Sequence, residues 1–269
     1  MIKYAIISDI HGNLEALKAV QDDMNVVGVD RVVCLGDIIS KGASGHECID
    51  LVKKMCDVCV RGNNDIKYTK SLDEIASEPD FDYDYFYWTQ KQLSGDDIKF
   101  LRNLPMCCEF MLSGRLVRCF HATPEDSNRS VFNYDNYKQK LELFNKSEFT
   151  TDRSADIVVY GHTHHVGMEK LFGRLLVNVG SVGNTLNLVS DPYYNAKNTS
   201  EFTQAEYVIL SGEDGDDNAD ISVEFRTVRY NKEKVVEECA LRGLKADQYR
   251  NEILHGEYRH PERIKNLSF

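Results

Sequence analysis

Histidine, aspartate and asparagine side chains gather in five short polar clusters, each directly after an apolar run of β-type residues. The clusters are Asp9-x-His11, Gly36-Asp37, Gly62-Asn63, His121 and Gly161-His162-x-His164. Imidazole nitrogens and carboxylate oxygens suit Mn, Fe, Zn or Ni, and a set without thiolates argues against a closed structural zinc site. Two cations about 3.5–4 Å apart, bridged by a carboxylate, lower the pKa of a bridging water and hold phosphoryl oxygens for in-line attack. The residue types therefore indicate phosphoryl chemistry at two metal ions.

Strands must carry these clusters to one place. In the first half of the chain, apolar runs at 3–7, 31–35 and 58–61 each lead into a cluster, and helical spacing follows Asn13 and covers 45–54. Strands that alternate with helices predict parallel βαβ units, whose ligands bind beyond the carboxyl ends of the strands. On an extended backbone, alternating residues of a D-x-H or H-x-H cluster can project in one direction.

The second half of the chain has more hairpins. Hairpins are predicted over 107–120 and around Phe172-Gly173, a helix over 134–146, and strands over 156–160, 205–210 and 221–229. We therefore predict an α/β fold of two facing mixed β-sheets flanked by helices, a four-layer αββα sandwich that forms one domain over 1–269. Residues 68–104, rich in acids and aromatics, are predicted to form a small helical cap insertion that either overhangs the site or packs on the edge of the core.

The charge balance limits the classes of partner that the chain can bind. Lys and Arg number 32 against 43 Asp and Glu, which gives a net charge of −11. A chain this acidic has no broad cationic surface for nucleic acid or anionic membranes, whereas a small phosphorylated substrate can still bind where metal cations reverse the local charge. No apolar run is long enough for a signal peptide or a membrane span, so we expect a cytoplasmic protein whose eight cysteines are reduced.

The ordered clusters resemble the motifs of the calcineurin-like metallophosphoesterases, and the bacterial branch related to diadenosine tetraphosphatases is the most similar in look. The matching segments are Ser8-Asp-Ile-His-Gly-Asn13, Leu35-Gly-Asp37, Arg61-Gly-Asn63, Phe120-His-Ala122 and Tyr160-Gly-His-Thr-His164. The segment 178–183, Asn-Val-Gly-Ser-Val-Gly, resembles an N-P-G-S-V-G segment of that branch, with Val179 in place of the usual proline.

The resemblance implies a complete set of seven metal ligands. One divalent ion would be held by Asp9, His11 and His164, the other by Asn63, His121 and His162, and Asp37 would bridge them. Mn or Fe is the expected metal, with Zn, Ni and Co as alternatives. Asp37, Asn63 and His121 would take part in catalysis through the two ions and a bridging hydroxide. The complete set speaks against a degenerate, non-catalytic relative.

One position departs from the family pattern. Many members carry a histidine after the motif asparagine, where it can protonate the leaving oxygen, but here the residue is Asn64, which cannot supply a proton at neutral pH. This favours good leaving groups, such as a nucleotide phosphate, over a simple alkoxide. We expect Asn64 and Lys67 to contact the substrate. Lys41 and Arg129 are interpreted as surface charges near the motif loops.

The leading hypothesis is a phosphoesterase that hydrolyses phosphodiester or phosphoanhydride bonds, with dinucleoside polyphosphates of the diadenosine tetraphosphate type as substrates. A Ser/Thr protein phosphatase and a cyclic-nucleotide phosphodiesterase are alternatives within the same chemistry. An alternative of another class is a non-catalytic interaction module, since the same fold serves as a scaffold in the retromer complex. A nuclease is disfavoured by the acidic balance. The sequence leaves the oligomeric state and the natural substrate open.

Overall fold

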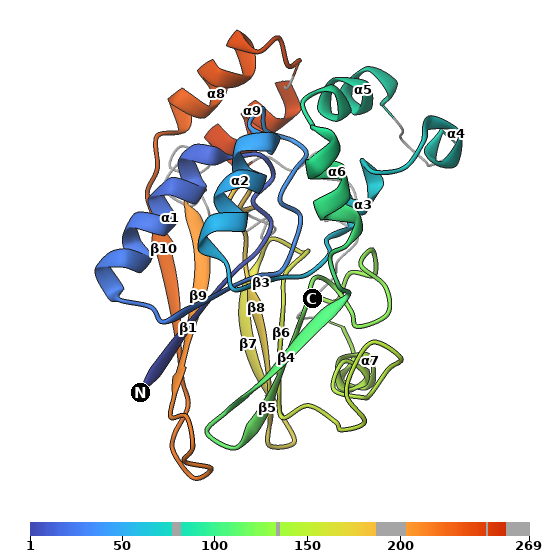
Figure 1. Cartoon of the computed structure of the whole chain (residues 1–269). Coiled ribbons are helices and arrows are strands. Elements are labelled where there is room, and N and C mark those ends of the chain that lie inside the picture. The colour runs from blue at the N-terminus through green and yellow to red at the C-terminus, as the bar shows by residue number, and fades with distance from the viewer. Residues whose placement is uncertain (77–81, 133–134, 187–202, 246, 257–269) are drawn as a thin grey trace.

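A computed structural model describes residues 1–76, 82–132, 135–186, 203–245 and 247–256, and shows two five-stranded sheets packed face to face (Figure 1). Sheet A contains, in spatial order, β10 (Ser222–Val228), β9 (Ala205–Gly212), β1 (Ile2–Ile7), β2 (Arg31–Cys34) and β3 (Val58–Cys59). Strands β1, β2 and β3 are parallel, while β9 and β10 form an antiparallel extension. The strand predicted over 58–61 is shorter because the Arg61 N–H turns away to the carbonyl of Pro105, at 2.8 Å.

Sheet B has a parallel centre and antiparallel edges. Its spatial order is β4 (Cys107–Leu112), β5 (Arg115–Phe120), β6 (Ile157–Tyr160), β8 (Arg174–Val179) and β7 (Val166–Leu171). Strands β5, β6 and β8 run parallel, and the two predicted hairpins attach β4 and β7 at the edges. Both sheets are therefore mixed, as the sequence predicted.

The alternation of side chains along each strand builds the core between the sheets. On β1, Ile6 faces sheet B, whereas Ala5 and Ile7 face the helices on the other side, and all three are fully buried. Val117 and Val159 of sheet B meet Ile6 in the central core. Burying side chains of this size stabilises the fold by about 1.5–3 kcal/mol each, which holds the ends of the strands in a fixed relation.

Helices cover the outer faces of both sheets (Figure 1). Helices α1 (Leu14–Val27) and α2 (Gly45–Met55) cover sheet A, and Asn13 caps α1 as predicted by accepting a hydrogen bond from the Ala16 N–H at 3.0 Å. On sheet B the helix predicted over 134–146 is only α7 (Tyr137–Glu142), because the following residues leave the helix and bury Leu143 and Phe144 in the outer core. The four-layer sandwich is thus confirmed, with a thin helical layer over sheet B.

The remaining helices gather beyond the carboxyl ends of the sheet A strands. They are α3 (Asn63–Lys67), α4 (Leu72–Ile75), α5 (Tyr83–Lys91), α6 (Gly95–Arg102), α8 (Lys232–Leu241) and α9 (Asp247–His255). Helix α5 packs on the C-terminal helices: Tyr85 and Trp88 contact the cluster that includes Tyr249, and the Trp88 indole N–H donates to the Arg242 carbonyl at 3.2 Å. No helix among the described residues combines the length and the apolar character needed to cross a bilayer.

Candidate metal centre

The seven residues singled out in the sequence come together where strands of both sheets end. Asp9 and His11 follow β1, Asp37 follows β2, Asn63 follows β3, His121 follows β5, and His162 and His164 follow β6. Because parallel strands present their carboxyl ends at one edge, and because the two sheets face each other, the loops of both halves of the chain meet there.

The first group consists of Asp9, His11 and His164, all buried and with their ligand atoms within 4.8 Å of one another. His164 Nε2 lies 3.0 Å from His11 Nε2 and 3.1 Å from Asp9 Oδ1. The distance from His11 Nε2 to Asp9 Oδ1 is 3.6 Å. Two imidazoles and a carboxylate thus point at one small space.

The second group is centred on His121. Its Nε2 lies 3.0 Å from Asn63 Oδ1 and 3.1 Å from His162 Nδ1. Asp37 Oδ2 lies between the two groups, 3.6 Å from His121 Nε2 and 3.7 Å from His11 Nε2. Asp9 also lies close to Asp37 and His121, and these three residues form a second possible ligand set.

The hydrogen-bond pattern indicates a cation between these atoms. His164 Nδ1 donates to the Asn184 carbonyl at 2.6 Å, so a neutral His164 presents a lone pair at Nε2, directly opposite Asp9 Oδ1. Asp9 Oδ1 is buried and accepts no hydrogen bond from the residues that the structure describes. Likewise His121 Nδ1 donates to the Leu35 carbonyl at 3.0 Å, so a neutral His121 presents a lone pair at Nε2. Acceptors that face one another without a hydrogen between them fit a divalent metal, and carbonyl partners behind the histidines are the usual support of such ligands.

The pKa shifts of the site residues also fit a cation at this place. Burial raises the pKa of Asp9, but the nearby His164 and His121 lower it more, so that it lies well below its usual range. Burial and the neighbouring His121 lower the pKa of His162 to about 4. Burial also lowers the pKa of His121, but the carboxylates of Asp37 and Asp9 outweigh it and raise the net value. Asp9 is therefore ionised and His162 neutral, as metal ligands must be, while the raised pKa of His121 shows that Asp37 and Asp9 stabilise a positive charge at this point.

The backbone at the site differs from the extended loops expected from the sequence. Five of the seven residues have a positive φ: Asp9 (55°), His11 (52°), Asp37 (51°), His162 (67°) and His164 (57°). Left-handed backbone at residues other than glycine costs about 1–3 kcal/mol each and persists where the surrounding structure enforces it. The alternation within D-x-H and H-x-H is thus produced by left-handed turns, and the strain is concentrated at the candidate site.

Asp65 holds two of the site loops together and was not recognised from the sequence as a site residue. Its buried carboxylate accepts hydrogen bonds from the N–H groups of Asp37 (2.8 Å), Ile38 (2.9 Å) and Gly62 (3.0 Å). A Cβ at Gly62 would lie 2.1 Å from the Asp37 nitrogen, so only glycine permits this approach. An acid at the third position of helix α3 is a capping signal that could have identified Asp65.

The segment 178–183 joins the loops of the two sheets. The Ser181 hydroxyl donates to the Asp9 carbonyl at 2.8 Å, and the Asn178 amide donates to the Gly161 carbonyl at 3.0 Å. The Ser8 hydroxyl and the His162 N–H both donate to Asp9 Oδ2, at 2.6 and 2.9 Å. These bonds occupy one oxygen of Asp9 and leave Oδ1 for a ligand.

Other residues near the motif loops differ in whether they contact the metal centre. Asn64 donates from its backbone to Asp37 Oδ1 at 2.8 Å and from its side chain to Asp37 Oδ2 at 2.5 Å. Arg129 pairs with Glu142 at the exposed surface, at 3.0 Å, as expected of a surface charge. The neighbouring Ser130, not singled out in the sequence, lies 3.0 Å from His162 Nε2.

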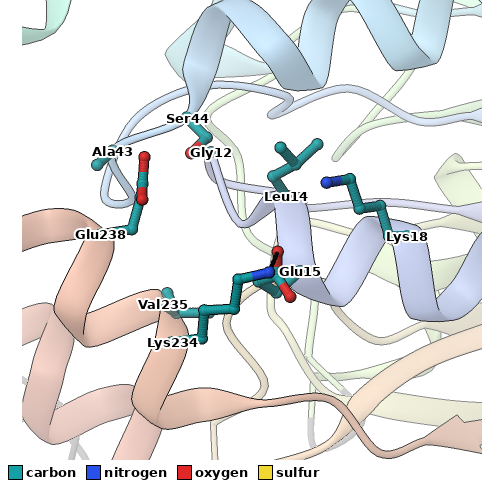
Figure 2. Close-up of a pocket in the computed structure, with 9 residues that line it drawn as sticks. All are labelled: Gly12, Leu14, Glu15, Lys18, Ala43, Ser44, Lys234, Val235 and Glu238. Carbon is teal, nitrogen blue, oxygen red and sulfur yellow. Dashed lines mark hydrogen bonds and ion pairs between the residues drawn. The ribbon is translucent and has the colours of Figure 1, made fainter.

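Two cavities lie beside the site. The larger, which we call the cap cleft, has a volume of about 590 Å³ and begins at Asn64. Its walls are Ser40-Lys41, α3, α5 and α9. The smaller, of about 220 Å³, lies between α1, Ala43-Ser44 and α8, and none of the seven candidate ligands lines it (Figure 2). None of the seven lines the cap cleft either, but Asn64, which donates hydrogen bonds to Asp37, lines it together with Lys67, so the cap cleft adjoins the metal centre through Asn64.

Comparisons with known proteins agree with this fold. A family model described as the calcineurin-like phosphoesterase superfamily domain matches residues 2–213. An uncharacterized protein of Methanocaldococcus jannaschii is 28% identical over 241 residues, which are 87% of this chain and 90% of the relative. The crystal structure of a metallophosphoesterase from Sphaerobacter thermophilus is similar with a TM-score of 0.69 at 24% identity, covering 95% of this chain and 99% of that one. A hypothetical protein from Pyrococcus horikoshii is similar with a TM-score of 0.74 at 16% identity, covering 96% and 99%.

Proposed function

The chain belongs to the calcineurin-like phosphoesterase superfamily, and on this premise we propose that it is a two-metal phosphoesterase that hydrolyses phosphodiester or phosphoanhydride bonds. The observation that carries the proposal is the unpaired Asp9 Oδ1, which lies 3.1 Å from His164 Nε2 in a buried site where both sheets meet. Asp9, His11 and His164 would hold one divalent ion, Asn63, His121 and His162 the other, and Asp37 would connect them.

In this site the chain's own residues would orient the metal ligands and balance their negative charge. Divalent ions, when bound, supply an activated water and neutralise phosphoryl oxygens. The Leu35 and Asn184 carbonyls fix the rings of His121 and His164, so their Nε2 atoms are positioned before metal binds. Asn64 neutralises part of the charge of Asp37 through two hydrogen bonds and faces the cap cleft. Mn or Fe is the proposed metal, because the donor set is mixed nitrogen and oxygen.

We further propose a small phosphorylated substrate, a nucleotide of the dinucleoside polyphosphate type. Asn64 in place of a histidine supports good leaving groups, since it supplies no proton. A cleft of about 590 Å³ beside the metal centre has the volume of a small-molecule site. The cytoplasmic location expected from the sequence is part of this proposal.

The test is manganese-dependent hydrolysis of diadenosine tetraphosphate and of bis(p-nitrophenyl) phosphate, with metal content measured on the same protein and Asp37→Asn as the control. We expect turnover of both substrates that requires metal and is lost in the variant. Turnover of bis(p-nitrophenyl) phosphate alone would support the phosphoesterase but contradict a dinucleotide substrate. Faster turnover of phosphoserine peptides than of the dinucleotide would favour a protein phosphatase. Silence on every substrate would favour the non-catalytic module.

A further inference from the structure

The inner end of the cap cleft is joined directly to the metal centre. On one side, Asn64 donates two hydrogen bonds to Asp37. On the other side, Lys41 is followed by Gly42, whose N–H donates to the His11 carbonyl at 2.8 Å. Asn64 and Lys41 both line the cleft, so its wall is connected on two sides to loops of the metal centre.

Lys41 is held in a fixed position on the wall of this cleft. Its ammonium contacts Glu252 of α9 at 2.9 Å; the Glu252 side chain is only 4% exposed and that of Lys41 is 28% exposed. Ser40 and Lys41 both have a left-handed backbone, with φ of 81° and 62°, which indicates a loop held in place by its surroundings. An ammonium has three N–H donors, and Glu252 accepts from one of them. Lys41 can therefore also bind an anion in the cleft.

Beyond Lys41 the cleft has aromatic walls and a balanced charge. Tyr68 and Tyr249 are buried, with their hydroxyls anchored on Ser40 (3.2 Å) and on the Gly183 carbonyl (3.1 Å). Tyr85 of α5 is half-buried and lines the cleft. In the described part of the chain, the charged lining residues are Lys41, Lys67, Lys245, Asp82, Asp247 and Glu252. Three cations and three anions do not attract a long polyanion, whereas rigid aromatic walls suit a planar ring.

We propose that the cap cleft binds a nucleoside diphosphate portion of the substrate, with Lys41 on the phosphate next to the scissile one and Tyr85 against the base. This rests on the proposed function and names the part of the substrate that gives it specificity. A single phosphate would bind at the metal centre without using Lys41, and inorganic pyrophosphate would use Lys41 without using Tyr85. The contributions of the phosphate at the metal centre, the neighbouring phosphate and the base to the affinity can therefore be measured separately.

The experiment is calorimetric titration of the metal-loaded protein with ADP, AMP and inorganic pyrophosphate. We expect ADP to bind about tenfold more tightly than AMP, as one charge-assisted contact predicts. Lys41→Met should remove this preference, and Lys41→Arg should keep it to within about threefold because the charge remains. Tyr85→Leu should weaken ADP about tenfold through loss of stacking and leave pyrophosphate binding unchanged.

Matched controls come from outside the cleft. Lys234 pairs with Glu15 at 2.8 Å across the smaller cavity (Figure 2), and Tyr87 is an exposed residue of α5 stacked on Tyr83. Lys234→Met and Tyr87→Leu should leave all three affinities unchanged. Equal affinities for ADP and AMP, or a Lys41→Met variant that behaves like Lys234→Met, would overturn the inference. Thermal unfolding of each variant shows that an altered affinity does not come from misfolding.

The two proposals fail in different ways. If the protein hydrolyses bis(p-nitrophenyl) phosphate with metal but shows no Lys41-dependent preference for ADP, the cleft assignment is wrong and the phosphoesterase stands. If no substrate is hydrolysed but ADP binds through Lys41 and Tyr85, the cleft assignment stands and the protein is a nucleotide-binding module.

Discussion

The metal centre and the cap cleft share Asn64, yet they are built from different parts of the molecule. The metal centre consists of residues that follow strands of both sheets, all within the region 2–213 that matches the family model. The cap cleft is lined by α5, which also lies within the matched region, and by α9, which lies beyond it. The candidate metal ligands thus all lie in the part of the chain that the family model covers, whereas the proposed nucleotide site uses residues from both sides of its boundary.

The two regions also differ in how they are held. At the metal centre the backbone groups of the loops take part directly: the Asp9 N–H donates to the Gly36 carbonyl, and the Asp65 carboxylate accepts from the N–H groups of Asp37 and Gly62. At the cap cleft, single side-chain contacts such as Trp88 to Arg242 hold helix to helix. A site fixed through backbone tolerates little change, whereas helices joined by a few side chains can vary without disturbing it. This difference leads to four predictions.

The largest effect is expected from Asp9→Asn. Asp9 belongs to two possible ligand sets, and loss of residues behind a metal ligand already costs about 10–100-fold in metal affinity or activity. We therefore expect activity to fall by more than about 100-fold, together with loss of bound metal measured by mass spectrometry. Asp23→Asn, at the surface ion pair with Arg226, is the control and should keep its metal. An Asp9→Asn variant that retains both ions would contradict the assignment of Asp9 as a metal ligand.

Metal removal should lower the stability of the whole fold. Because the ligand set exists only in the folded chain, metal at about 100 times its Kd would stabilise the protein by about 2.7 kcal/mol per ion. Denaturant unfolding with and without chelator measures the difference. The Asp9→Asn variant should lose most of this metal-dependent stabilisation. An identical unfolding curve for chelated and metal-loaded wild type would contradict a metal centre at this place.

Asp65→Asn tests whether the backbone clamp is needed. An amide nitrogen cannot accept the hydrogen bonds that a carboxylate oxygen accepts, so buried N–H groups of the Asp37 and Gly62 loops lose their partner. We expect a loss of about 1–3 kcal/mol in the free energy of unfolding, and activity about 10–100-fold lower because the ligands are less well placed. Full activity in a stable variant would show that the metal alone positions the loops.

The smallest effect is expected from Trp88→Phe, which loosens the contact of α5 with α8 outside the cleft lining. It removes one hydrogen bond, worth about 0.5–1.5 kcal/mol of stability. Hydrolysis of bis(p-nitrophenyl) phosphate should stay within about twofold of wild type, with Tyr87→Leu as the matched surface control on the same helix. A tenfold loss would mean that the helices and the metal centre are coupled, and the contrast between the two regions would fail.

The sequence was sufficient for much of the fold and for the identity of the clustered residues. Strand and helix periods are local properties, so the hairpin strands Cys107–Leu112 and Arg115–Phe120 could be read to the residue. The polar clusters could be recognised because each follows its strand directly. The helix expected over 134–146 was too long, since tertiary packing of Phe144 ended it early.

The sequence alone thus determined which residue types follow which strands, because this depends only on the order of residues along the chain. The tertiary structure decided what the side chains do there. Only the meeting of two sheets sets His164 against Asp9, 155 positions earlier, and turns their backbone into the left-handed region. Only the docking of α9 pairs Glu252 with Lys41 and makes a surface charge into the wall of a cleft. The physical reason is that hydrogen bonds and charges act over a few ångströms, and a linear pattern does not contain those distances.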